Sequence, residues 1–156
     1  IIFISNRLKR LLGVVHDPLR KKHEGSPMTP KRRQCMSGKR KNRLLSSYLS
    51  QEVYDIMNFL VEREEMKKVV FVKRAIRDFM QGERKIDERV LITARTDPMY
   101  IERNKMVTVE LDEEQREQLL VVARENGCNQ SQVFFQCILN YCLKLIAEDP
   151  TGLTIE

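Results

Sequence analysis

The sequence predicts a mainly helical fold with a short two-stranded β-ribbon, because one strand–helix–helix unit occurs twice along the chain. The copies cover about residues 43–80 and 105–142, and one offset of 62 residues relates them without gaps. Under this offset Leu49 corresponds to Leu111, at the end of each strand. A unit of this size cannot bury a core alone, so we expect the two copies to be paired.

The second copy begins with the pattern of a half-buried strand. Residues 106–111 (MVTVEL) alternate and are β-branched, which predicts two faces. The inward face is expected to hold Val107, Val109 and Leu111, and the solvent face Met106, Thr108 and Glu110. Asp112 then stands where a helix begins, and two glutamates follow it at the positive end of the helix dipole.

Two helices complete the second copy. The first has an apolar stripe at Leu119, Val122 and Ala123 and is expected to end at Gly127. Asn129 is the predicted cap of the second helix. Its apolar positions recur at helical spacing: Val133, Phe134, Cys137, Ile138, Tyr141 and Cys142.

The first copy has the same order of strand and helices, but its strand and turn signals are weaker. Its strand is expected to place Leu45, Ser47 and Leu49 inward and Leu44, Ser46 and Tyr48 outward. Ser50 is the predicted helix cap, and the apolar positions that follow are Val53, Ile56, Met57, Leu60, Phe71, Val72, Ala75, Ile76 and Phe79. Glu65 stands where the second copy has Gly127, and a residue with a Cβ disfavours a left-handed turn. A plain helical hairpin therefore stays open for this copy.

The charge is concentrated before the first copy. Residues 1–43 hold 13 Lys and Arg against two acids, whereas residues 106–156 hold three against nine. Such an arm is either a solvated, disordered tail or a segment that binds phosphates by displacing counterions. The expected divisions are a basic, largely disordered arm (1–42), the first unit (43–80), a linker (81–104), the second unit (105–147) and an acidic tail (148–156).

The ends and the cysteines give further expectations. Because the sequence opens with Ile, Met28 and Met36 are candidate starts, and whether residues 1–27 belong to the functional protein stays open. The opening IIFI is too short to span a membrane. The four cysteines form no CxxC pair, and Cys137 and Cys142 fall in an apolar helix pattern, where we expect buried, reduced thiols. We accordingly expect a cytoplasmic location, no bound metal and no cofactor.

The linker allows two assemblies. Residues 81–105 are long enough for the two copies to pair inside one chain as a pseudo-dimer, which we favour because closing such a loop costs only a few kcal/mol. Alternatively each copy pairs with its equivalent in a second chain, as a homo-oligomer. Within the linker, residues 89–93 are a candidate extra strand.

These features resemble the ribbon-helix-helix units of the Arc and Met repressor class. The resemblance rests on the strand VTVEL, a cap directly after it, fifteen steps from cap to turn, and ENG-C-NQSQ at the start of the second helix. It implies that the ribbon enters the major groove of DNA. The implied base contacts are Leu44, Ser46, Tyr48, Met106, Thr108 and Glu110. The implied phosphate contacts are Lys67, Lys68, Asn129, Gln130 and Ser131, together with Lys39, Arg40, Lys41 and Arg43 of the arm.

The resemblance implies a sequence-specific double-stranded DNA-binding protein without catalytic activity: a transcriptional repressor, an antitoxin or an accessory protein of DNA transfer in a mobile element. For Met106, Thr108 and Glu110 an ordinary exposed strand face stays open. The alternative function is a protein-interaction module, or an antitoxin, whose acidic second unit and tail bind a partner protein. An enzyme is disfavoured because no phosphate loop, nucleophile–base pair or metal-spaced ligand set stands out.

Overall fold

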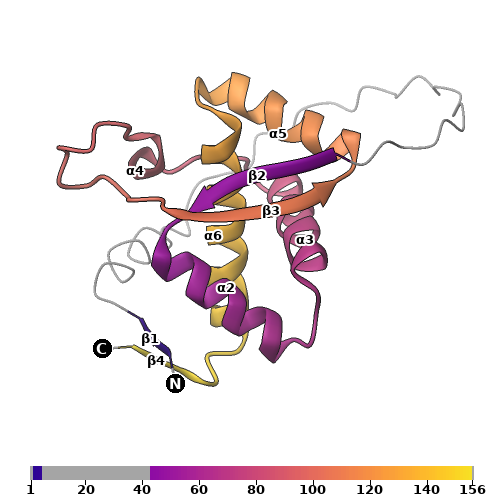
Figure 1. Cartoon of the computed structure of the whole chain (residues 1–156), viewed down its shortest axis with the longest axis vertical. Coiled ribbons are helices and arrows are strands. Elements are labelled where there is room, and N and C mark those ends of the chain that lie inside the picture. The colour runs from indigo at the N-terminus through magenta and orange to yellow at the C-terminus, as the bar shows by residue number, and fades with distance from the viewer. Residues whose placement is uncertain (1, 5–42, 156) are drawn as a thin grey trace, which may run out of the picture.

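The fold is mainly helical and carries a two-stranded antiparallel sheet, which confirms the predicted fold class at this level (Figure 1). The computed structural model describes residues 2–4 and 43–155. Its elements are β1 (Ile2–Ile4), β2 (Arg43–Leu49), α2 (Gln51–Arg63), α3 (Lys68–Gln81), α4 (Glu88–Leu91), β3 (Lys105–Leu111), α5 (Glu113–Asn126), α6 (Gln130–Glu148) and β4 (Leu153–Ile155).

The sheet is formed within the chain, by β2 and β3. Arg43 lies opposite Leu111 and Leu49 lies opposite Lys105, so the two strands overlap along their full length. The six residues predicted to face inward do so. Five of them are buried: Ser47, Leu49, Val107, Val109 and Leu111; Leu45 is partly buried against the core. The strand pair is called the ribbon below.

The helices form a layer beneath the ribbon. In the view of Figure 1, α2 lies below the ribbon, α5 lies above it, and α6 passes behind it. Residues 132–139 of α6 are all buried, which makes α6 the central element of the core. The ring of Phe71 meets that of Tyr141 edge-on, with centroids 4.9 Å apart, and joins α3 to α6. All the apolar positions predicted for the helices of the two copies are buried.

The turns that follow α2 and α5 have the same hydrogen-bond pattern. Glu65 and Gly127 both take the left-handed conformation, with φ of 49° and 62°. Each turn is closed by two nested backbone hydrogen bonds, an outer one of the 6→1 type and an inner one of the 5→2 type, which form the Schellman motif that ends many helices. The four bonds are Met66 N to Val61 O (3.0 Å), Glu65 N to Glu62 O (3.1 Å), Cys128 N to Ala123 O (2.9 Å) and Gly127 N to Arg124 O (3.3 Å). Each donor and acceptor residue in one turn is 62 positions from its equivalent in the other. The offset seen in the sequence therefore extends to backbone geometry.

The helix caps agree with the sequence at two positions and differ at a third. Ser50 accepts a hydrogen bond from Val53 N, and Asn129 forms a reciprocal capping box with Gln132. Asp112 occupies the cap position of α5, but its side chain does not cap the helix. Its carboxylate lies 3.4 Å from Lys73 Nζ instead, because α3 brings that ammonium next to the start of α5.

The predicted strand at residues 89–93 is wrong, because Glu88–Leu91 forms the short helix α4. The physical reason is tertiary packing. Ile86 and Val90, four residues apart, are both buried, and a helical turn places them on one side. Two glutamines of α6 hold the same segment: Gln132 Nε2 donates to Val90 O (3.0 Å), and Gln136 Oε1 accepts from Asp87 N (2.9 Å). The segment between the two units therefore contributes Ile86 and Val90 to the core.

The end of the chain is attached to α2. Arg63 donates to the carbonyl oxygens of Asp149 (2.5 Å) and Leu145 (3.4 Å). Gly152 has a φ of 82° and lies against Phe59, where a Cβ would come within 2.8 Å of the ring. Residues 153–155 then pair in parallel with residues 2–4. The segment predicted as an acidic tail is thus anchored at least as far as this glycine.

Candidate functional site

The outer face of the ribbon presents all six side chains predicted to contact bases. Each is exposed: Leu44, Ser46, Tyr48, Met106, Thr108 and Glu110. The three apolar or aromatic ones have large exposed fractions, 72% for Leu44, 59% for Met106 and 48% for Tyr48. The strand period of two places them on this face, opposite the buried set. The ribbon therefore brings the six together on one surface.

The register fixes which of the six lie opposite one another. Leu44 faces Glu110, Ser46 faces Thr108 and Tyr48 faces Met106. At the centre, Ser46 Oγ and Thr108 Oγ1 are 2.9 Å apart and hydrogen-bonded. One of the two hydroxyls donates its proton to the other, so the proton of the second hydroxyl remains available for an external acceptor.

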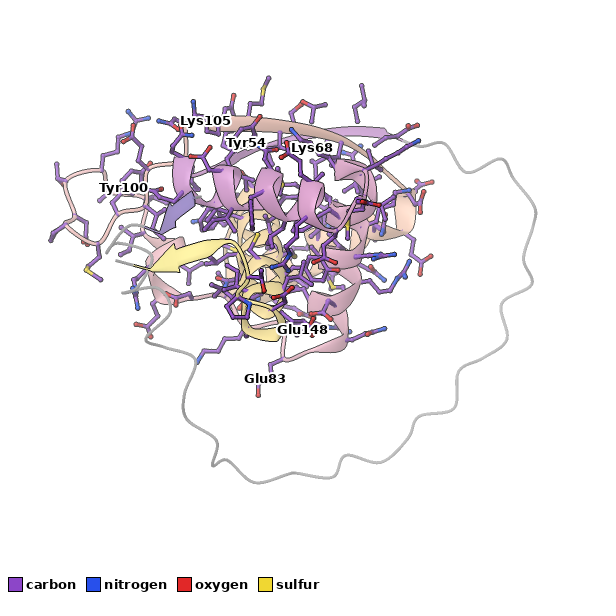
Figure 2. All side chains as sticks on the ribbon, turned by 90° about the horizontal axis from the view of Figure 1, so that it is seen from below. Tyr54, Lys68, Glu83, Tyr100, Lys105 and Glu148 are labelled. Carbon is purple, nitrogen blue, oxygen red and sulfur yellow. The ribbon has the colours of Figure 1, made fainter. Side chains whose placement is uncertain are left out.

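The start of α3 is an open, basic helix terminus. Lys67 stands at the N-cap and makes no side-chain hydrogen bond to the first turn, and residues 67–70 are all exposed. Lys68 Nζ lies 5.3 Å from the ring centre of Tyr54, which holds this ammonium over α2. In Figure 2, Tyr54, Lys68 and Lys105 lie towards the ribbon, whereas Glu83 and Glu148 lie on the opposite side of the molecule.

The start of α6, the equivalent terminus of the second unit, is already engaged. Asn129 Oδ1 accepts from Gln132 N (2.9 Å), and Gln132 Oε1 accepts from Asn129 N (3.0 Å). Ser131 Oγ lies 2.8 Å from Ser47 Oγ on the inner face of β2. Gln130 Nε2 is buried without a hydrogen-bond partner. Only the α3 terminus of this pair therefore combines exposure with positive charge.

Two basic residues that were not predicted as contacts lie at the start of β3: Arg103 just before the strand and Lys105 as its first residue. Lys105 begins the strand, opposite Leu49. The guanidinium of Arg103 lies 5.7 Å from the ring centre of Phe135, and its Nη1 is buried without a hydrogen-bond partner. Burial lowers the pKa of Arg103, against an opposing effect of Tyr100. Their position directly ahead of VTVEL was the one available signal, because a stacking partner on α6 cannot be inferred from sequence.

The arm residues Lys39, Arg40 and Lys41 lie outside the described residues. Arg43 opens β2, so whatever precedes it joins the ribbon at the end that carries Leu44 and Glu110.

Within residues 2–4 and 43–155, no three His, Cys, Asp or Glu side chains come together in a way that could hold a metal ion. No helix in this part of the chain is long and apolar enough to cross a bilayer. Comparisons with protein-family models, with curated proteins and with solved structures gave no match.

Proposed function

We propose that this protein binds double-stranded DNA sequence-specifically, with the ribbon in the major groove, as two tandem ribbon-helix-helix units paired into a pseudo-dimer. The observation that carries the proposal is the outer face of the ribbon, which exposes the six residues together and places equivalent positions of the two units symmetrically about the central pair Ser46 and Thr108. A two-stranded ribbon is one of the two elements that fit the width of this groove. The repeated turn after α2 and after α5 supports the equivalence of the units.

Charge supports DNA as the ligand of this face. Residues 1–43 carry 13 Lys and Arg against two acids and lead directly into β2. Lys67 and Lys68 add two cations at the open terminus of α3, where backbone N–H groups and the helix dipole favour a phosphate. Phosphate contacts of this kind position a protein on the duplex, and the ribbon side chains would then select the sequence.

The proposal extends to the biological setting. Transcriptional repression and an accessory role in DNA transfer both require a sequence-specific duplex binder, and the proposed site serves either. Recovering the DNA bound in cells separates them: a site beside the protein's own promoter indicates repression, and a site beside a nick indicates transfer.

The direct test is a fluorescence-anisotropy titration of the full chain with a duplex selected from a random library. Binding should weaken steeply with salt, and Lys67→Ala with Lys68→Ala should lower the slope of log K against log salt by roughly two. Arg77→Ala is the matched control, because Arg77 is exposed on the same helix but nine residues, roughly 14 Å, further from its start. Deleting residues 28–43 should also flatten the slope.

Three results would count against the proposal. They are failure to select any duplex, salt-insensitive binding, and unchanged affinity after Tyr48→Ala with Ser46→Ala in a folded variant.

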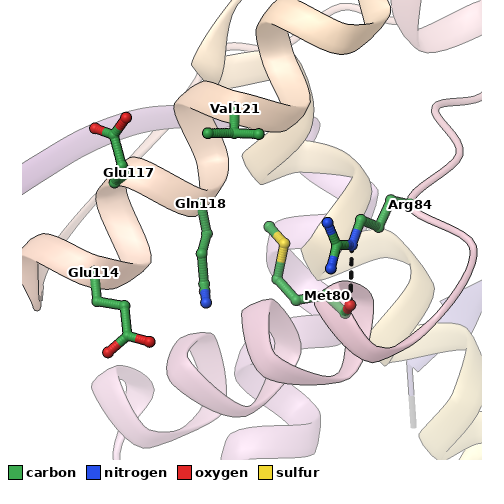
Figure 3. A pocket seen from close by; sticks show the side chains of 6 residues that line it. All are labelled: Met80, Arg84, Glu114, Glu117, Gln118 and Val121. Carbon is green, nitrogen blue, oxygen red and sulfur yellow. Dashed lines mark hydrogen bonds between the residues drawn. The ribbon is translucent and has the colours of Figure 1, made fainter. Parts of the chain in front are cut away.

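A second candidate function is binding of a basic segment of a partner protein by α5. The observation that favours it is a surface pocket between the end of α3 and α5 (Figure 3), lined by Met80, Arg84, Glu114, Glu117, Gln118 and Val121. Arg84 is turned back onto α3 through a bond from Nε to Met80 O (3.1 Å). Glu114→Gln with Glu117→Gln should then abolish binding of a Lys- and Arg-rich peptide while leaving DNA affinity intact. Equal peptide binding by the variant would exclude this site.

A further inference from the structure

The outer face of the ribbon is unusually apolar for a surface that contacts a polyanion. Three of its six side chains are apolar or aromatic, and each exposes about half or more of its area. Exposed apolar groups gathered on one face usually mark a binding surface. The hydroxyls at the centre bond to each other, which reduces what they can offer to a base. The apolar groups are therefore the main recognition elements of this face.

Major-groove chemistry limits what these groups can select. The only apolar group that a base pair presents there is the 5-methyl of thymine. Leu44, Tyr48 and Met106 are suited to that group, since each can cover a methyl with carbon. Glu110 can accept a hydrogen bond only from an amine, which cytosine and adenine present, and it repels the acceptor edges of guanine and thymine.

The two halves of the ribbon differ at one of three positions. The offset of 62 makes Leu44 equivalent to Met106 and Ser46 equivalent to Thr108, and both pairs are similar in chemistry. The third pair, Tyr48 and Glu110, joins an aromatic residue to a carboxylate. The helix termini that flank the ribbon also differ between the two units, because α3 begins with two exposed lysines and α6 begins with a closed capping box.

We infer that the DNA element bound by this ribbon is non-palindromic and is selected chiefly through thymine methyl groups that contact Leu44, Tyr48 and Met106. The inference rests on the proposed function and adds the class of sequence. The end of the ribbon with Tyr48 and Met106 selects thymines. The end with Leu44 and Glu110 selects a thymine next to a base with an exposed amine. One chain therefore binds its site in one orientation.

The test uses the duplex selected by the full chain and replaces its thymines one at a time with deoxyuridine. This change removes the methyl and leaves base pairing and the O4 acceptor in place. Each contacted methyl should account for about a fourfold loss of affinity, the equivalent of one buried CH₂. Replacements in the flanks of the same duplex are the control and should have no effect.

Side-chain substitutions identify which residue contacts each thymine methyl or amine-bearing base. Leu44 is 72% exposed, so Leu44→Ala should fold normally and make one thymine insensitive to deoxyuridine. Glu110→Gln should weaken the preference for an amine-bearing base, because an amide can also donate to an acceptor edge.

Two palindromic duplexes test the asymmetry, each carrying one half of the selected site twice. Both should bind more weakly than the selected site. Uniform insensitivity to deoxyuridine, or a palindrome bound as tightly as the selected duplex, would overturn this inference and leave DNA binding intact. Failure to bind any duplex would instead refute the proposed function and this inference with it.

Discussion

The left-handed residues at the two equivalent turns allow a matched test of backbone strain. Glu65 has a φ of 49° and carries a side chain, whereas Gly127 has a φ of 62° and none. A Cβ added at Gly127 would meet no atom within 4 Å, so a substitution there changes backbone strain without steric contact. The perturbations are Glu65→Gly in one variant and Gly127→Ala in another.

The expected magnitudes follow from two opposed effects. A left-handed residue with a Cβ costs about 1–2 kcal/mol, and replacing glycine with alanine gains roughly 0.4–1 kcal/mol by restricting the unfolded chain. Gly127→Ala should therefore lower the free energy of unfolding by about 1 kcal/mol. Glu65→Gly reverses both effects and also removes an acid from a helix C-terminus, so it should raise that free energy by about 1 kcal/mol.

The assay is urea denaturation followed by circular dichroism, with the m-value checked for constancy. A change of 1 kcal/mol corresponds to a shift of roughly 2–4 °C in Tm for a chain of this size. Glu64→Gly is the control, because Glu64 has a φ of −85° and gains nothing from glycine. If Glu65→Gly destabilises the protein as much as Glu64→Gly does, the strain argument fails and the two turns are not equivalent.

Three further predictions concern the core, the thiols and acid stability. Ser47→Ala should lower the free energy of unfolding by about 1–2 kcal/mol because it leaves Ser131 Oγ without its partner at 2.8 Å. Replacing both serines should lower that free energy by less, and a double-mutant cycle with no coupling would contradict this. Iodoacetamide should modify Cys128 in the native protein before the buried thiols of α6, whose pKa burial raises far above the ordinary value, and equal labelling by mass spectrometry would exclude it. Hydrogen bonds from the hydroxyl and then the amide of Thr151 lower the pKa of Asp149. Its contribution to the free energy of unfolding is therefore present above the pKa of the unfolded chain, 3.8, and is lost as the pH falls through the lower pKa of the folded protein. Asp149→Asn should flatten the acid side of the stability profile, and an unchanged profile would refute this.

The sequence was sufficient for the two strands of the ribbon, their inner and outer faces and most helix ends, but it did not predict β1 or β4. Strict alternation over residues 106–111 determines which side chains are buried, and Gly127 determines where α5 ends. The pairing of β2 with β3 was one of two assemblies left open, and a periodic pattern cannot distinguish a partner in the same chain from one in another.

One strand prediction was wrong, and two further features could not be predicted, because tertiary contacts override local preference. Residues 89–93 have strand propensity, yet the buried side of α6 holds Ile86 and Val90 through a helical turn and two glutamines. The stacking of Arg103 on Phe135 joins residues 32 positions apart, and no local pattern predicts it. Glu65 adopts the conformation of its glycine counterpart because the two Schellman bonds outweigh its intrinsic preference.

The covalent connection between β2 and β3 has a consequence for how the ribbon behaves at low copy number. Tethered partners meet at an effective concentration of about millimolar, so dilution to a few molecules per cell does not separate the strands. The midpoint of thermal unfolding should accordingly be the same at nanomolar and micromolar protein. The connection also frees each strand from symmetry, since a substitution in one is not copied into the other. Evolution can thus alter Tyr48 and Glu110 independently.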